Sequence, residues 1–61
     1  MQQAELQKKL EEVKGHVLCC AIQLEQMIAN TPTGKLREEL TTLNIHTGIA
    51  YVNLKSIKLE N

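Results

Sequence analysis

The chain has almost no aromatic side chains: its 61 residues include one Tyr and neither Phe nor Trp. Aromatic residues supply much of the buried area in small proteins, so any core here must be built from aliphatic side chains. The length allows one small domain. Chains this short usually need disulfides, a metal or a partner subunit for stability, and the sequence must be searched for each of these.

Cysteine is scarce as well, and the two cysteines, Cys19 and Cys20, are adjacent. Adjacent cysteines cannot join distant parts of the chain, so we expect a reduced, cytoplasmic protein. The first residues contain no basic segment followed by an apolar run, and no stretch approaches the roughly 18 apolar residues of a membrane span. We therefore expect neither secretion nor contact with a membrane.

Charge of one sign is also missing, because seven Lys and Arg balance seven Asp and Glu. A neutral chain does not attract a long polyanion, which disfavours binding to DNA or RNA. A small ligand with two or three phosphates needs only a few clustered cations and backbone amides. The balanced charge therefore leaves a small anionic ligand as a candidate.

Apolar residues are abundant, and they recur with alternating spacings of four and three in two separate runs. This spacing predicts two helices, over residues 3–29 and 35–59, with a turn at 30–34. We call the two runs together the seam; its members are Leu6, Leu10, Val13, Val17, Cys20, Leu24 and Met27, then Leu36, Leu40, Leu43, Thr47, Ala50, Leu54 and Ile57.

The turn contains residues typical of helix ends. Asn30 tolerates a left-handed conformation, Thr31 can cap the next helix, and Pro32 suits a first helical position. So short a connection predicts antiparallel neighbours in which residue numbers that sum to about 64 face each other. The predicted fold is all-α, with residues 1–61 forming a single helical-hairpin domain.

A second apolar stripe lies beside the seam. One hairpin contact buries only one stripe on each helix, so the second stripe predicts a homo-oligomeric helical bundle. A dimeric four-helix bundle is the simplest form and a larger ring is an alternative; the plainer interpretation is a broad face of ordinary flanking positions. The residues of this stripe are Leu18, Ile22, Ile28, Ile45, Ile49 and Val52.

His16, Cys19 and Cys20 follow a spacing that places three possible metal ligands near one helix surface. A zinc site would need His46 or a second copy to supply the missing ligand. Free cysteine is more often a small apolar residue in a core, so we predict no metal and no cofactor. The histidine and cysteines also lack an orienting acid and an oxyanion hole, so we predict that the protein is not an enzyme.

The turn and the start of the second helix carry the chemistry best suited to an anion. Exposed amides at a helix start lie beside Thr33, Lys35 and Arg37, and such an arrangement can hold phosphate. Thr41 and Thr42 follow one turn later and either line a polar pocket or bond back to the helix carbonyls. The alternative for the turn is an ordinary capped turn with solvated cations.

Tyr51, as the only aromatic residue, is either half-buried beside the seam or available to stack on a nucleobase. Gly48, in the middle of the second helix, is expected to permit close approach by another helix or a ligand. Tyr51 completes the predicted ligand-binding set, which is Thr33, Lys35, Arg37, Thr41, Thr42 and Tyr51.

The second half of the chain resembles a phage-encoded family of cyclic-oligonucleotide sponges that suppress bacterial CBASS defence. The resemblance rests on Pro32-Thr33-Gly34-Lys35-Leu36-Arg37, on Leu40-Thr41-Thr42-Leu43, and on the later Ala50, Leu54 and Ile57. Asn44-Ile45 stands where that family has an acidic pair. The resemblance implies a homo-oligomer that sequesters cyclic di- or trinucleotide immune signals in the host cytoplasm without cleaving them. The alternative is a small adaptor or inhibitor that docks an apolar helix face on a host protein.

Overall fold

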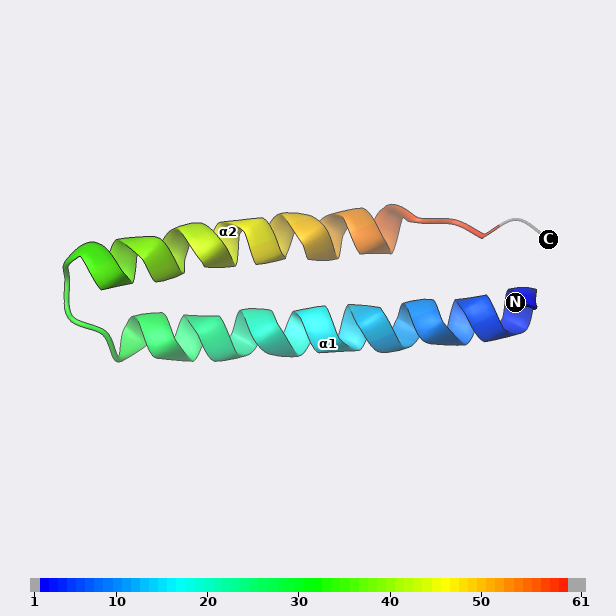
Figure 1. Ribbon diagram of the computed structural model, residues 1–61, viewed down its shortest axis with the longest axis horizontal. Coiled ribbons are helices and arrows are strands. Elements are labelled where there is room, and N and C mark those ends of the chain that lie inside the picture. The colour runs from blue at the N-terminus through cyan, green and yellow to red at the C-terminus, as the bar shows by residue number, and fades with distance from the viewer. Residues whose placement is uncertain (1, 60–61) are drawn as a thin grey trace.

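The computed structural model describes residues 2–59 and shows two helices lying side by side (Figure 1). Helix α1 spans Gln3–Ala29 and helix α2 spans Lys35–Ser56. They run antiparallel and form a rod of 48 × 14 × 13 Å. The predicted all-α hairpin is confirmed, while α2 ends three residues before the predicted position 59.

The turn lies where the sequence placed it, but its residues act differently. Asn30 has φ −98° rather than a left-handed conformation, and its side-chain Nδ2 donates to the Gln26 carbonyl at 2.8 Å. The Thr31 hydroxyl donates to the Met27 carbonyl at 2.6 Å, so it closes α1 instead of capping α2. Pro32 precedes the helix, and Gly34, at φ 156°, is the N-cap of α2.

The two helices contact each other through half of the seam. Leu10, Val17 and Leu24 of α1 are partly covered, as are Leu40 and Leu54 of α2. The remaining partly covered helical positions follow the same spacing: Lys14, Ala21, Ile28, Asn44, Thr47, Gly48 and Tyr51. Ile28, which the sequence assigned to the second stripe, therefore belongs to the contact between the helices.

The other half of the seam is left uncovered. We call this surface the open face. Four of its residues belong to α1, three belong to α2 and one follows the end of α2; both sets recur at intervals of seven, which keeps residues on one side of an α-helix. Its members are Leu6, Val13, Cys20 and Met27 of α1, and Leu36, Leu43, Ala50 and Ile57 at and beyond α2, all of them exposed.

The rest of the second stripe lies on the other side of the rod, which we call the opposite face. Its members are Leu18, Ile22, Ile45, Ile49 and Val52, and each is exposed. The helix contact between the two faces buries none of residues 2–59 fully. The exposed large apolar side chains retain 41–63% of their accessible surface. No helix within this part of the chain is long and apolar enough to cross a membrane.

Candidate functional site

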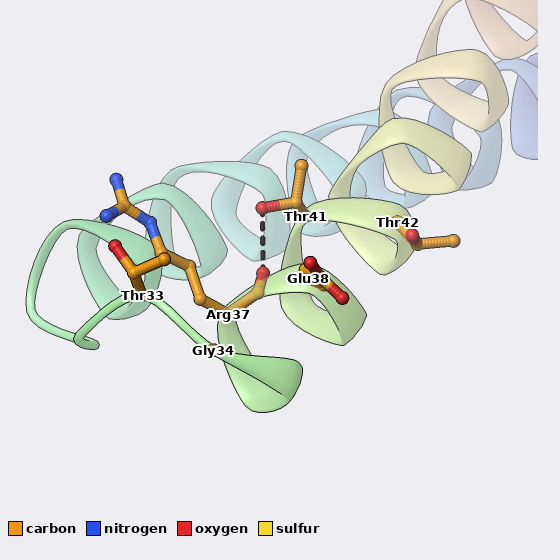
Figure 2. A pocket seen from close by; sticks show the side chains of 6 residues that line it. All are labelled: Thr33, Gly34, Arg37, Glu38, Thr41 and Thr42. Carbon is orange, nitrogen blue, oxygen red and sulfur yellow. Dashed lines mark hydrogen bonds between the residues drawn. The ribbon is translucent and has the colours of Figure 1, made fainter.

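A shallow hollow at the start of α2 collects four of the six predicted ligand residues (Figure 2). It has a volume of about 380 Å³ and opens to solvent. Thr33 and Gly34 come from the turn and the others from the first two turns of the helix, because positions three and four apart share a helix surface. Its lining residues are Thr33, Gly34, Arg37, Glu38, Thr41 and Thr42.

The backbone at this hollow presents unused donors. Gly34 accepts the first intrahelical bond, from the Glu38 amide at 3.1 Å, and no side chain caps the helix. The amides of the first helical turn, which begins at Lys35, therefore lack intrahelical acceptors. Together with the helix dipole, such amides favour a bound anion. The side-chain cap that the alternative interpretation expected is missing, whereas the cations are exposed to solvent, as that interpretation expected.

Arg37 is the free cation of the hollow: its guanidinium forms no ion pair or hydrogen bond with any of residues 2–59. Glu38 lines the same hollow and is exposed. Its carboxylate complements the positive end of the helix dipole, and it also repels an incoming anion. The predicted ligand-binding set did not include Glu38, which lines the hollow together with Arg37.

The two threonines of α2 near the turn are not equivalent. The Thr41 hydroxyl donates to the Arg37 carbonyl at 2.8 Å, drawn as the dashed line in Figure 2. Its proton is used by the helix, so Thr41 can only accept. The side chain of Thr42 bonds none of residues 2–59, and the same holds for Thr33. Thr33 and Thr42 are therefore the hydroxyls available to donate to a ligand.

Lys35 lies outside this hollow. It lines a neighbouring depression of about 390 Å³ with Glu38, Glu39 and Thr42. Its Nζ is 3.9 Å from a carboxylate oxygen of Glu39, and its side chain is 90% exposed. At that exposure the pair contributes little stability, so Lys35 remains able to turn toward an anion.

Tyr51 is not brought to the hollow within one chain. It lies 14 residues beyond Arg37 on the same helix, which corresponds to about 21 Å along the axis. Its ring is half-buried, and the Lys55 Nζ lies 5.6 Å from the ring centroid. Tyr51 can join a ligand held at the turn only if that turn belongs to another copy.

A third cavity, a groove of about 360 Å³, runs between the helices near the middle of the hairpin. Val17 and Thr47 share it, as the predicted pairing of positions requires, and Cys20 and Ala50 connect it to the open face; His16 and His46 complete its lining. Cys19 does not line it. No group of three possible metal ligands occurs in residues 2–59, and both thiols are free and exposed.

Asn44 is a polar residue in the contact between the helices, a position that the sequence analysis did not assign to it. Its Oδ1 atom is buried without a hydrogen-bond partner among the described residues. Such an atom loses its hydration on folding and regains nothing. The signal was available in the spacing, because Leu40, Asn44 and Thr47 follow one another at intervals of four and three.

Comparison of the chain with protein-family models, with curated proteins and with solved structures finds no match in any of the three. The interpretation of the site therefore rests on its own residues.

Proposed function

We propose that this chain is a binding protein, not an enzyme, which assembles from copies of its hairpin and sequesters a small cyclic oligonucleotide without cleaving it. The observation that carries the proposal is the hollow at the start of α2, where uncapped helix amides lie beside the unpaired Arg37 guanidinium. Cyclic oligonucleotides carry a phosphodiester for each nucleotide, and the amides and the guanidinium are suitable phosphate donors. The protein would act in the cytoplasm of a phage-infected host.

Self-assembly supplies what a single chain lacks. One hollow has a single free cation and a shallow shape, whereas a di- or trinucleotide extends over several nucleotides. Tyr51 offers a ring for stacking on a base, but within one chain it is about 21 Å from Arg37. In an oligomer, the turn of one copy can lie close to the Tyr51 of another.

The first test is a thermal-shift screen of the wild-type protein with cyclic dinucleotides and cyclic trinucleotides. A ligand present at 100 times its Kd adds about 2.7 kcal/mol to stability. For a domain of this size each kcal/mol raises Tm by roughly 4–8 °C, so a specific ligand raises Tm by more than 10 °C. The absence of a shift with every compound refutes the proposal.

A matched pair of variants then locates the site. Arg37→Ala removes one cation from the hollow, and Lys8→Ala removes one from the exposed surface of α1. Charge-assisted hydrogen bonds contribute about 1.5–3 kcal/mol, so Arg37→Ala should weaken nucleotide binding by roughly 10- to 150-fold. Lys8→Ala should bind as the wild type does, in calorimetric titrations at one salt concentration. Equal losses in the two variants would mean a non-specific charge effect.

The second candidate is an adaptor or inhibitor that binds a host protein. It is favoured by the exposed apolar side chains along both helices, since patches above a few hundred Å² usually mark an interaction site. The two candidates differ in one measurable respect. The adaptor requires an apolar face that stays exposed after self-assembly, whereas the sequestering protein requires only the hollow to stay open.

A further inference from the structure

The open face consists of four layers that extend along the whole hairpin. The antiparallel register assigns to each layer one residue of α1 and one from the α2 side whose numbers sum to 63, close to the expected sum of 64. A repeat of seven residues keeps a surface in contact with a neighbouring helix along a bundle. None of the eight side chains is charged. The layers are Leu6 with Ile57, Val13 with Ala50, Cys20 with Leu43, and Met27 with Leu36.

We infer that a second copy of this chain covers the open face, and that the two hairpins form a four-helix bundle with their turns at opposite ends. The contact inside each hairpin already supplies alternate layers, such as Val17 with Thr47 and Leu24 with Leu40. The layers of the open face fall between them. Joining two copies through this face therefore completes one continuous core with the alternation of a helical bundle.

The exposed area of the hairpin agrees with a missing partner of this size. A compact monomer of 6.9 kDa exposes about 4,000 Å² by the usual scaling of surface with mass. The hairpin exposes 4956 Å², an excess of about 1,000 Å² over that scaling. Each partner in a standard protein interface buries about 800 Å². One copy of the same chain therefore accounts for the excess.

The opposite face is less suited to this role. Its apolar residues gather near the middle of the hairpin and do not reach the ends. Lys14 and Glu11, which lie four and seven residues before Leu18 on the same side of α1, form an ion pair with N and O atoms 3.0 Å apart. A partner helix placed along this face would cover that pair, whereas none of the eight side chains of the open face is charged.

The sizes of the side chains select the arrangement of the two copies. The layer of Val13 and Ala50 is small, and the layer of Cys20 and Leu43 is larger. If both turns were at the same end, the small layer of Val13 and Ala50 would meet the same small layer of the second copy. The result would be a void, which is costly in a core. With the turns at opposite ends, the small layer meets the Cys20–Leu43 layer of the second copy, and large and small side chains alternate.

This inference specifies the self-association on which the proposed function rests, and its test uses no ligand, so the two can fail separately. The test is disulfide formation in the full-length C19S/V13C protein, in which the only thiols are at positions 13 and 20. Within one helix these positions are about 10 Å apart along the axis, beyond the 4.4–6.8 Å between Cα atoms that a disulfide spans. In the proposed bundle, position 13 of one copy lies level with position 20 of the other.

We expect C19S/V13C to convert almost completely to a covalent dimer under mild oxidation, as seen on a non-reducing gel. The matched controls, C19S alone and C19S/C20S/V13C, should remain largely uncrosslinked. Efficient crosslinking of C19S alone would mean that Cys20 meets its own copy, which overturns the opposed arrangement. No crosslink in any variant, or a wild-type chain that stays monomeric, would show that a different occupant covers the open face.

A second cysteine pair guards against a failure of V13C to fold. In a chain with C19S and C20S, the substitutions L43C and A50C place the same geometry on α2, again seven residues apart. Far-UV circular dichroism identifies which variants remain helical. A helical L43C/A50C variant that forms no covalent dimer overturns the inference as firmly as the first pair does.

Discussion

Leu43 and Ile45 are two residues apart on α2 and almost equally exposed, at 51% and 58%, yet they lie on different faces. Substituting each with Asp introduces the same charge and the same helix propensity within one turn of the helix. If the open face is the interface, Leu43→Asp should disrupt the dimer and Ile45→Asp should not. The pair therefore separates an effect on assembly from an effect on the helix itself.

The expected magnitude follows from the exposed fraction. Burying a whole leucine side chain is worth about 1.5–3 kcal/mol, so covering the exposed half of Leu43 contributes roughly 1 kcal/mol in each copy. Both copies change together, and a carboxylate must also be desolvated. A loss of at least about 3 kcal/mol corresponds to a rise of more than 100-fold in the dimer Kd.

Sedimentation velocity over a dilution series measures that Kd directly. We expect the boundary of Leu43→Asp to shift toward the monomer at concentrations where wild type and Ile45→Asp remain associated. Because none of residues 2–59 is buried in the single hairpin, the dissociated variant should also lose helical signal in circular dichroism. Dissociation of Ile45→Asp with an intact Leu43→Asp dimer would refute the reasoning and place the interface on the opposite face.

Three further substitutions test other parts of the structure by thermal unfolding. Asn44→Leu removes the unpaired buried amide oxygen and should stabilise the protein by about 1–3 kcal/mol; a loss of stability would mean that Asn44 finds a partner in the assembly. Gly48→Ala should add about 1 kcal/mol, since a Cβ there meets nothing within 4 Å; destabilisation would show that another copy approaches Gly48. Gly34→Ala, at φ 156°, should cost about 1–3 kcal/mol, and an unchanged Tm would contradict the strain assigned to this position.

The hairpin was predictable from the sequence because its two signals are local. The alternating spacing marks both helices, and residues 30–34 interrupt it in a way that fits a short turn. The roles inside the turn were harder to predict. Thr31 has two acceptable partners, the end of α1 or the start of α2, and the choice depends on how the chain leaves α1.

The division of the seam into two halves was not predictable from spacing alone. The sequence treats Leu10 and Val13 as members of one stripe, but a helix packed against a single neighbour covers a narrower arc than the whole seam. Leu10 therefore faces α2 while Val13 does not. Ile28 moved in the other direction, from the second stripe into the contact between the helices, because it falls one turn beyond Leu24.

The candidate site was predicted only in part, because the sequence reveals local spacing but not contacts between distant residues. Thr33, Arg37, Thr41 and Thr42 are close in sequence, so helical spacing brings them together. The prediction of Tyr51 came from its chemistry and not from its position, and no spacing along one helix can bring it to the turn. The Thr41 hydroxyl shows why residue type alone is insufficient, since its proton is already bonded within the helix.

The central claim is that this hairpin does not exist as a folded monomer, and the native mass of the wild-type protein tests it most directly. Sedimentation equilibrium at low micromolar concentration, with circular dichroism on the same sample, should give a helical species of twice the 6.9 kDa chain mass or a higher multiple. A fully helical species with the mass of one chain would contradict the account.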